Sequence, residues 1–123
     1  MNDRTKAGAF MAWLSDFAPA YACGNVPVGA ESPYFAIEWA EGAFADGDVS
    51  VLVNLWAKTD SEAAPNAVVA EVSKSLGVGC KLIPCDGGAM LVKRGSPFAQ
   101  AVEADGEWRR RYINLDIEFI TSF

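Results

Sequence analysis

Residues 46–76 read DGDVSVLVNLWAKTDSEAAPNAVVAEVSKSL, and this stretch decides the fold class. A turn is followed by an apolar segment at 49–57, a polar break at 58–62 and an amphipathic segment that ends at Leu76. A nucleotide-binding strand–helix unit would need a glycine-rich loop at the break, because backbone N–H groups must approach the phosphates closely. The break contains no glycine, so we interpret the unit as scaffold.

Alternating apolar residues predict two strands joined by a hairpin. In segment 49–57, valines line one face and Leu52 and Trp56 line the other, a pattern typical of a central strand or of one that meets a partner. Segment 34–40 alternates with one apolar face, as in a half-buried strand. The Asp-Gly pair at 46–47 favours a tight hairpin between them, since glycine tolerates positive φ.

Two helices are predicted on either side of these strands. Apolar residues, many of them aromatic, recur at helical spacing and indicate a helix over 3–18. The second helix is expected over 61–76. Thr59 and Glu62 have the spacing of a capping box at its start, and Gly77 suits a left-handed cap at its end.

The C-terminal part adds three strands. Residues 80–94 predict two short strands about an Asp-Gly-Gly turn, residues 95–107 are expected to be irregular or to hold one helical turn, and residues 108–119 alternate strictly. The predicted order is α-β-β-α-β-β-β. Because the strands cluster in hairpins, we expect an α+β fold in which a mainly antiparallel sheet carries both helices on one face. The length of 123 residues corresponds to a single domain, 1–123.

Composition argues against several kinds of site. A net charge of −6 and a pI of about 4.5 argue against binding of a nucleic-acid duplex. The chain has no histidine, the commonest general base and metal ligand, and Cys23, Cys80 and Cys85 are too few for a zinc site. The odd number of cysteines fits a reducing cytoplasm, and the apolar runs are too short to span a membrane. We therefore expect no enzyme activity, no metal and no cofactor.

Two pairs of carboxylates lie two residues apart, Asp46 with Asp48 and Asp116 with Glu118. Such pairs can hold a divalent cation or act as general acid and base. The first pair lies on a predicted turn and the second on the polar side of a predicted strand, where exposed acidic residues are common. We therefore assign no catalytic role to either pair.

Residues 108–112, WRRRY, form the basic cluster of the chain. Aromatic and cationic residues together can bind single-stranded nucleic acid, but on a strand Arg110 points away from Arg109 and Arg111, which splits the cluster. We expect the arginines to pair with carboxylates of another subunit, because guanidinium groups match carboxylates in a bidentate manner. The candidate carboxylates are Glu103, Asp105 and Asp116. Aromatic residues are enriched at interface centres, and the predicted subunit interface comprises Trp56, Trp108, Arg109 and Arg111.

Three segments resemble the tail-completion (tail terminator) proteins of long-tailed bacteriophages and prophages, which are also called minor tail or minor capsid proteins. Residues 32–42, SPYFAIEWAEG, look like the first strand of that family after a proline-containing loop. Residues 47–76 look like its strand that ends in a tryptophan, followed by a polar break and a helix. Residues 93–120, KRGSPFAQAVEADGEWRRRYINLDIEFI, look like its closing strand. With the N-terminal helix, the resemblance covers most of the chain.

The resemblance implies a structural virion protein that is assembled in the bacterial cytoplasm. Such a subunit forms a ring, usually of six copies, at the head-proximal end of the tail tube, where it stops polymerisation and offers the surface that joins the head. The implied partners are other copies of the chain, the tail tube protein and a head-completion protein, without a membrane. Our own hypothesis is that an acidic lining of the ring keeps passing DNA from adhering, with Asp46 and Asp48 as the candidate lumen-facing residues.

Other functions stay open at this point. A head-completion or neck subunit at the head–tail connector shares the small size and the ring. A small-ligand-binding or enzymatic α+β domain could use the aromatic face of the N-terminal helix as a pocket wall, although no convergent polar residues support it. An acidic mimic of DNA would need a regular array of carboxylates, whereas those of this chain are scattered. The sequence leaves the ring number, the tube-binding face and the oligomeric state of the free protein open.

Overall fold

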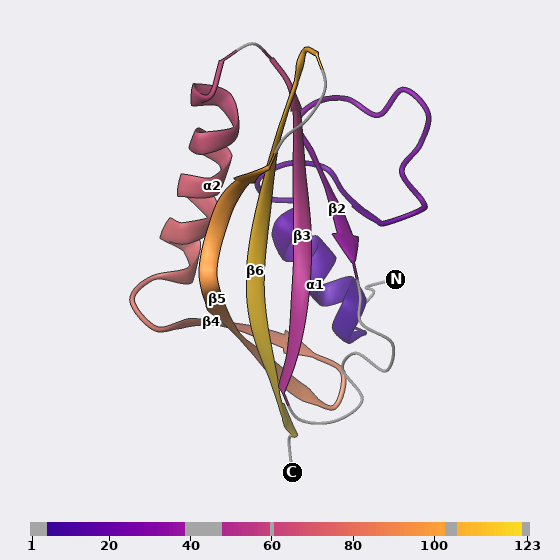
Figure 1. Ribbon diagram of the computed structural model, residues 1–123. Coiled ribbons are helices and arrows are strands. Elements are labelled where there is room, and N and C mark those ends of the chain that lie inside the picture. Colours follow the sequence, from indigo (N-terminus) through magenta and orange to yellow (C-terminus); the bar gives the residue numbers. More distant parts are fainter. Residues whose placement is uncertain (1–4, 39–47, 60, 103–105, 122–123) are drawn as a thin grey trace.

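Residues 5–38, 48–59, 61–102 and 106–121 are described by the computed structural model, and within them two helices lie on one face of a six-stranded sheet (Figure 1). The strand order is β1-β2-β3-β6-β5-β4. Strands β1 and β2 are parallel, and the other neighbouring strands are antiparallel. The predicted α+β class is therefore confirmed. The elements are α1 (Lys6–Leu14), β1 (Ala20–Ala22), β2 (Tyr34–Glu38), β3 (Asp48–Lys58), α2 (Ala63–Leu76), β4 (Cys80–Cys85), β5 (Gly88–Val102) and β6 (Trp108–Thr121).

Strands β3 and β6 form the centre of the sheet. They pair over the whole of β3, from Asp48↔Glu118 to Lys58↔Trp108. The period-two alternation predicted for β6 is confirmed, since Ile113, Leu115 and Ile117 are fully buried on the face that the helices cover. The side chains between them point to the opposite face. This alternation gives the sheet one apolar face and one mixed face.

Both helices pack on the apolar face. Phe10 and Leu14 of α1 and Val72 and Leu76 of α2 are buried in the same core cluster as the central strands. The indole Nε1 of Trp13 donates a hydrogen bond to Ser75 Oγ at 2.9 Å, which links the two helices directly. One layer of helices therefore covers one face of the sheet, as the hairpin pattern predicted.

The N-terminal region departs from the prediction in two ways. Helix α1 ends at Leu14, so the prediction of a helix to residue 18 was wrong at its C-terminal end. Strand β1 follows and was not predicted, which adds one strand to the expected order. A strand of three residues is too short to show an alternating pattern. It forms because β2 offers an edge with free backbone groups. The residues on either side of β1 also bond to β2: Phe35 N–H donates to Pro19 O, and Cys23 N–H donates to Ile37 O.

Strand β5 is longer than expected. It continues to Val102, so the prediction of irregular structure from residue 95 was wrong for most of that segment. Its pairing with β6 shifts register between Arg94 and Ala99, which is characteristic of a bulge. This interruption hides the alternation in the sequence, while the long partner strand β6 keeps the segment extended.

The ends of α2 show one wrong and one confirmed prediction. Glu62 is the N-cap and its side chain makes no capping hydrogen bond, so the capping box with Thr59 is absent. Gly77 is the C-cap, as predicted, and its φ of +69° suits glycine, but its ψ of −152° lies outside the left-handed helical region. Arg94 of β5 stabilises this end, because Nη1 donates to Gly77 O and Nη2 to Ser73 O, both at 2.7 Å. The predicted hairpin turn at 46–47 lies outside the described residues.

Candidate functional site

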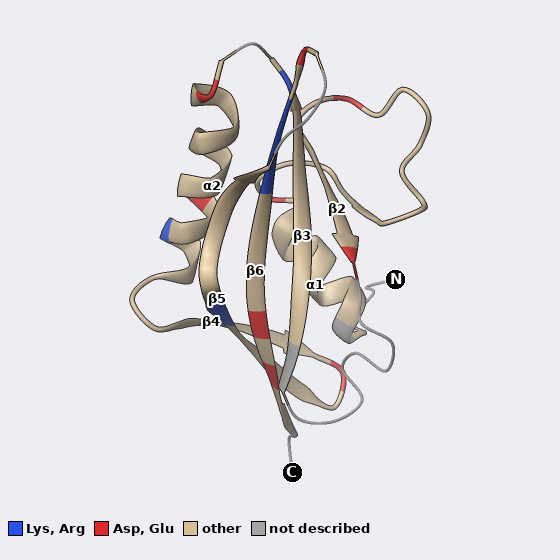
Figure 2. Cartoon of the chain, in the orientation of Figure 1, with Lys and Arg blue, Asp and Glu red and all other residues tan. Residues whose placement is uncertain are grey.

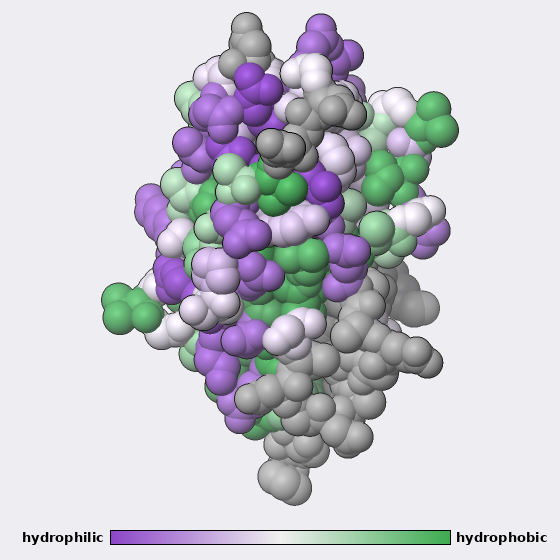
Figure 3. All heavy atoms as spheres, viewed as in Figure 1, coloured by the Kyte–Doolittle hydropathy of each residue, from purple (hydrophilic) through white to green (hydrophobic). Residues whose placement is uncertain are grey.

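The face of the sheet opposite the helices, here called the open face, is the main candidate for a functional surface. Figure 1 is viewed onto this face, with α1 behind the sheet. Figure 3 shows hydrophobic atoms near its centre, over β3 and β6, bordered by hydrophilic ones. The described residues of the open face include Tyr34 and Glu38 of β2, Leu52, Asn54 and Trp56 of β3, and Trp108, Arg110, Tyr112, Asn114, Asp116 and Glu118 of β6.

Charge is distributed unevenly along this face. Figure 2 shows cationic residues near the upper end of β6, where it starts, and acidic residues near its lower end. Asp116 accepts a hydrogen bond from Ser50 Oγ at 2.9 Å, and Glu118 forms an ion pair with Lys93 at 3.2 Å. The acidic end is therefore hydrogen-bonded within the chain, and the predicted Asp116–Glu118 pair has no visible catalytic partner among the described residues.

Aromatic rings meet edge to face at the cationic end of the open face. The Trp108 ring lies 6.1 Å from Trp56 and 6.2 Å from Tyr34, measured between ring centroids, and Tyr34 lies 6.1 Å from Tyr21. Edge-to-face pairs at such distances each contribute about 0.5–1.5 kcal/mol beyond their buried area. These four residues, called the aromatic cluster, are only partly buried. They form a rigid, partly apolar surface.

Arg110 lies beside the aromatic cluster between two rings. Its guanidinium carbon is 4.6 Å from the centroid of Trp56 and 4.7 Å from that of Tyr112. Nη2 donates to Asn54 Oδ1 at 2.9 Å and to Tyr112 Oη at 3.1 Å. Nε is buried without an acceptor, and Arg110 forms no ion pair with any described residue. The rings and Asn54 hold this cation in place without neutralising it.

Asn54 is a buried polar residue that orients this arrangement. Its Nδ2 donates to Ala36 O at 3.3 Å and to Glu38 Oε2 at 3.1 Å, while its Oδ1 accepts from Arg110. Both ends of the amide are therefore bonded, as a buried polar group requires. Asn54 connects β2, β3 and β6 across the open face.

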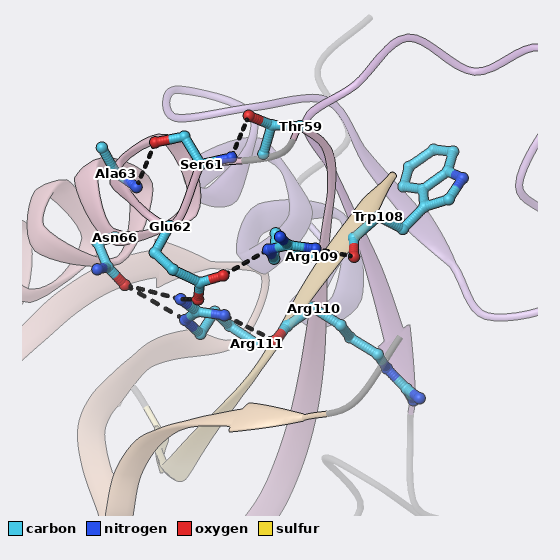
Figure 4. A network of polar contacts seen from close by, with 9 residues as sticks. All are labelled: Thr59, Ser61, Glu62, Ala63, Asn66, Trp108, Arg109, Arg110 and Arg111. Carbon is cyan, nitrogen blue, oxygen red and sulfur yellow. Dashed lines mark hydrogen bonds and ion pairs between the residues drawn. The ribbon is translucent and has the colours of Figure 1, made fainter. Parts of the chain in front are cut away.

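Arg109 and Arg111 point to the opposite side of β6, as the alternation predicted (Figure 4). Both form ion pairs with Glu62 at the start of α2. Arg111 is 7% exposed and also donates to Asn66 Oδ1 from Nη2 at 3.1 Å and from Nε at 3.3 Å. This Glu62 cluster fastens the first turn of α2 to the central strand, which gives it a structural role.

Comparison of the chain with protein-family models, with curated proteins and with solved structures found no match. The functional proposal therefore depends on the sequence and geometry of this chain.

The predicted interface residues divide between the two faces. Trp56 and Trp108 lie on the open face, where an interface could form. Arg109 and Arg111 have a carboxylate in their own chain, Glu62, in place of the expected carboxylates of another subunit. Participation of these four residues in an interface stays a prediction. The predicted lumenal residue Asp46, like the candidate carboxylates Glu103 and Asp105, lies outside the described residues. Asp48 begins β3, but its side chain is also outside them.

Sequence reasoning missed Arg110 as a member of the open-face site. The signal was present, because alternation places Arg110 on the side of the strand that also carries Trp108 and Tyr112. What the sequence lacks is the register that sets Trp56 directly opposite Arg110. That pairing creates the cation–π contact.

The described part of the chain also shows where possible metal ligands and the thiols lie. No three His, Cys, Asp or Glu side chains in those ranges gather to hold a metal ion. Cys23 and Cys80 are exposed free thiols, and Cys85 is a buried one. Neither described helix has the length and apolar character needed to cross a membrane.

Glu62→Gln is expected to reduce stability in a pH-dependent way. The hydrogen bond from Arg111 lowers the pKa of Glu62 below its usual 4.5, assisted by the charges of Arg111 and Arg109 and opposed by desolvation. A lowered pKa stabilises the fold above the unfolded-state value, and this contribution is lost as the pH falls through the folded-state value. The stability difference between wild type and variant should therefore be full at neutral pH and shrink below about pH 4.5.

Urea unfolding of wild type and Glu62→Gln at about pH 7 and about pH 3 checks this pH dependence. Glu71→Gln is the matched control, since Glu71 lies on the same helix, is exposed and forms no ion pair with another described residue. The free energy of unfolding of Glu71→Gln should match that of wild type at both pH values. An equally large loss for Glu62→Gln at both pH values would contradict the role of the ionised Glu62.

Proposed function

We propose that this protein is a tail-completion subunit that forms a ring, usually of six copies, at the head-proximal end of a phage tail tube. The observation that carries the proposal is the open face, which presents an aromatic cluster and an arginine without a carboxylate partner among the described residues. Trp, Tyr and Arg are the residues that most often dominate the binding energy of protein interfaces. Such a surface suits a subunit that functions by assembly.

The arrangement of the resembling segments supports the same proposal. Residues 32–42 contain β2, residues 47–76 contain β3 and α2, and residues 93–120 contain most of β5 and β6. Strands β2, β3, β6 and β5 are neighbours in the sheet. The resemblance therefore falls on one continuous part of the fold.

The size of the chain is compatible with a ring that DNA can pass. A compact chain of 123 residues has a radius of gyration of about 14 Å and a diameter of roughly 35 Å. Six equal discs in a ring leave a hole about one disc wide, which admits a duplex. In this proposal Asp46 and Asp48 line the hole. The partners are the tail tube protein on one side and a head-completion protein on the other.

A second candidate function is a small-ligand-binding domain, which one observation favours. An open hollow of about 410 Å³ lies between α1 and β4, and Trp13 is the aromatic residue in its lining. Its charged side chains are Asp16 and Lys81. The other lining residues are small or apolar: Ala9, Ala12, Trp13, Leu82, Ile83 and Pro84. The hollow offers few polar groups to orient a ligand, so we rank it below assembly.

Electron microscopy of tail tubes grown with and without this protein tests the proposal. The tubes are assembled from the tube protein of the same phage or prophage and stained negatively. We expect uniform tube lengths and an extra ring at one end when the protein is present. An unrelated acidic protein of similar mass is the control and should leave tube lengths unchanged. Tubes that overgrow with no added density would reject tail completion and favour the neck subunit.

A further inference from the structure

We propose that the open face of one copy binds the outer face of α2 of a second copy, with Arg110 of the first against Glu71 of the second. This inference rests on the proposed function, because it assigns the contact between neighbouring subunits of the ring. The outer face of α2 is defined here by five of its exposed residues, Ala63, Ala67, Ala70, Glu71 and Lys74.

Arg110 is prepared to receive a carboxylate. Its guanidinium is held between Trp56 and Tyr112, and its Nη2 is used within the chain. Nη1 has no acceptor among the described residues, and unlike Nε it is not buried. In this proposal Nη1 is the atom of Arg110 that takes a carboxylate of another copy as its partner. Charge-assisted bonds of this kind are roughly twice as strong as neutral ones.

The outer face of α2 offers small side chains and one carboxylate to the open face. Val72 and Leu76 turn the apolar side of the helix into the core, which leaves Ala63, Ala67 and Ala70 outside. Small side chains on the helix allow a sheet that carries large aromatic rings to approach it closely. Glu71 is exposed beside them and forms no ion pair with another described residue, so it is available to Arg110.

The lengths of the two surfaces agree. Helix α2 has 14 residues and is about 21 Å long. The aromatic and polar part of β6 from Trp108 to Asn114 spans about 23 Å at 3.3 Å per residue. A helix packed against the free side of a sheet is also a common way to cover it. Each copy would then be covered by the helix of its neighbour.

The placement of α2 is compatible with a ring. The two surfaces are different, so the contact is heterologous, and such contacts give rings or open helical filaments according to the rotation between copies. Figure 1 is viewed onto the open face and shows α2 at the β5 side of the sheet, whereas α1 lies behind β3. Because α2 is not directly behind the open face, successive copies are rotated relative to one another. Repetition of a rotation gives a ring when it closes and a filament when it does not, and the proposed function requires the ring.

A charge-exchange experiment tests the contact. Sedimentation equilibrium is measured at up to about 1 mM protein, where a contact with a Kd of about 1 mM is half occupied. Arg110→Glu places a carboxylate against Glu71 of the next copy, and Glu71→Arg places a guanidinium against Arg110 of the next copy. Like charges repel, so each variant alone should self-associate at least about tenfold more weakly than wild type. An equimolar mixture should recover association, because each variant then meets the opposite charge on both of its surfaces.

Two controls keep the result interpretable. Glu31→Arg makes the same charge change in the exposed segment between β1 and β2, and it should associate like wild type. Thermal unfolding shows whether Arg110→Glu still folds. Glu71→Arg changes an exposed side chain and preserves the test even if Arg110→Glu does not fold.

The outcomes separate this inference from the proposed function. Disruption by Arg110→Glu alone would mean that the open face binds a surface other than the outer face of α2, and it overturns the contact with α2. A wild-type chain that stays monomeric at about 1 mM would also overturn the contact with α2. A ring on the tube that still forms with both variants would overturn it as well. If the exchange pattern appears but wild-type protein does not stop tube growth, the contact stands and tail completion fails.

Discussion

Ile117→Ala is expected to lower the free energy of unfolding by about 3–4 kcal/mol. Ile117 is fully buried on the helix-covered face of β6, paired with Val92 of β5. Removal of its outer carbons loses their transfer free energy and leaves a cavity that the packed sheet can close only in part. The melting temperature of a domain of this size should fall by about 10 °C or more.

Ile120→Ala is the matched comparison for that change. Ile120 lies on the same strand, but its side chain is 42% exposed. The same atoms are removed from a site that already contacts water, so we expect a loss below about 1 kcal/mol. Urea unfolding with a common slope for both variants measures the difference. Equal losses would mean that the apolar and open faces of the sheet have been wrongly assigned.

Gly95→Ala is expected to destabilise the protein by about 1–3 kcal/mol. A Cβ atom at residue 95 would lie 2.8 Å from Asn114 Cβ and 2.9 Å from Asn114 O. The contact on the oxygen is with the backbone of the central strand β6, which cannot rotate away as a flexible side chain can. Residue 95 also lies where β5 shifts its register against β6. The glycine therefore allows the two strands to approach at the bulge.

Gly79→Ala provides the control, because a Cβ there meets nothing within 4 Å and its φ is not in the left-handed region. We expect Gly79→Ala to be neutral or to stabilise by up to about 1 kcal/mol, since alanine restricts the unfolded chain. Thermal unfolding of both variants makes the comparison. A Gly95→Ala variant as stable as Gly79→Ala would show that the strands can separate at the bulge without cost.

The comparison of Ile117 with Ile120 also shows which positions suit substitution in the functional experiments. The open face should tolerate changes at exposed positions such as Ile120, whereas the buried face should not. A loss of assembly in an open-face variant with an unchanged melting temperature therefore reports on binding. This separation matters most for Arg110, which has intramolecular contacts as well as the proposed intermolecular one.

Local patterns in the sequence determined the two long central strands, the body of α2 and its glycine cap. Ile113, Leu115 and Ile117 alternate with polar residues, and this alternation alone assigns them to a buried face. The same rule separates Arg110 from Arg109 and Arg111 by residue order alone. These features were predictable because side-chain direction in a strand depends only on residue parity.

Tertiary structure alone decided the partners of these residues. Glu62 and Arg111 are 49 residues apart, and nothing in their local sequence shows that the start of α2 lies over β6. The three residues of β1 become a strand only because β2 offers an edge, and the bulge after Arg94 conceals the continuation of β5. Register likewise placed Trp56 and Tyr112 around Arg110. The sequence determined which way each side chain points, and long-range packing determined what it meets, because contacts between distant segments depend on how the whole chain closes around one core.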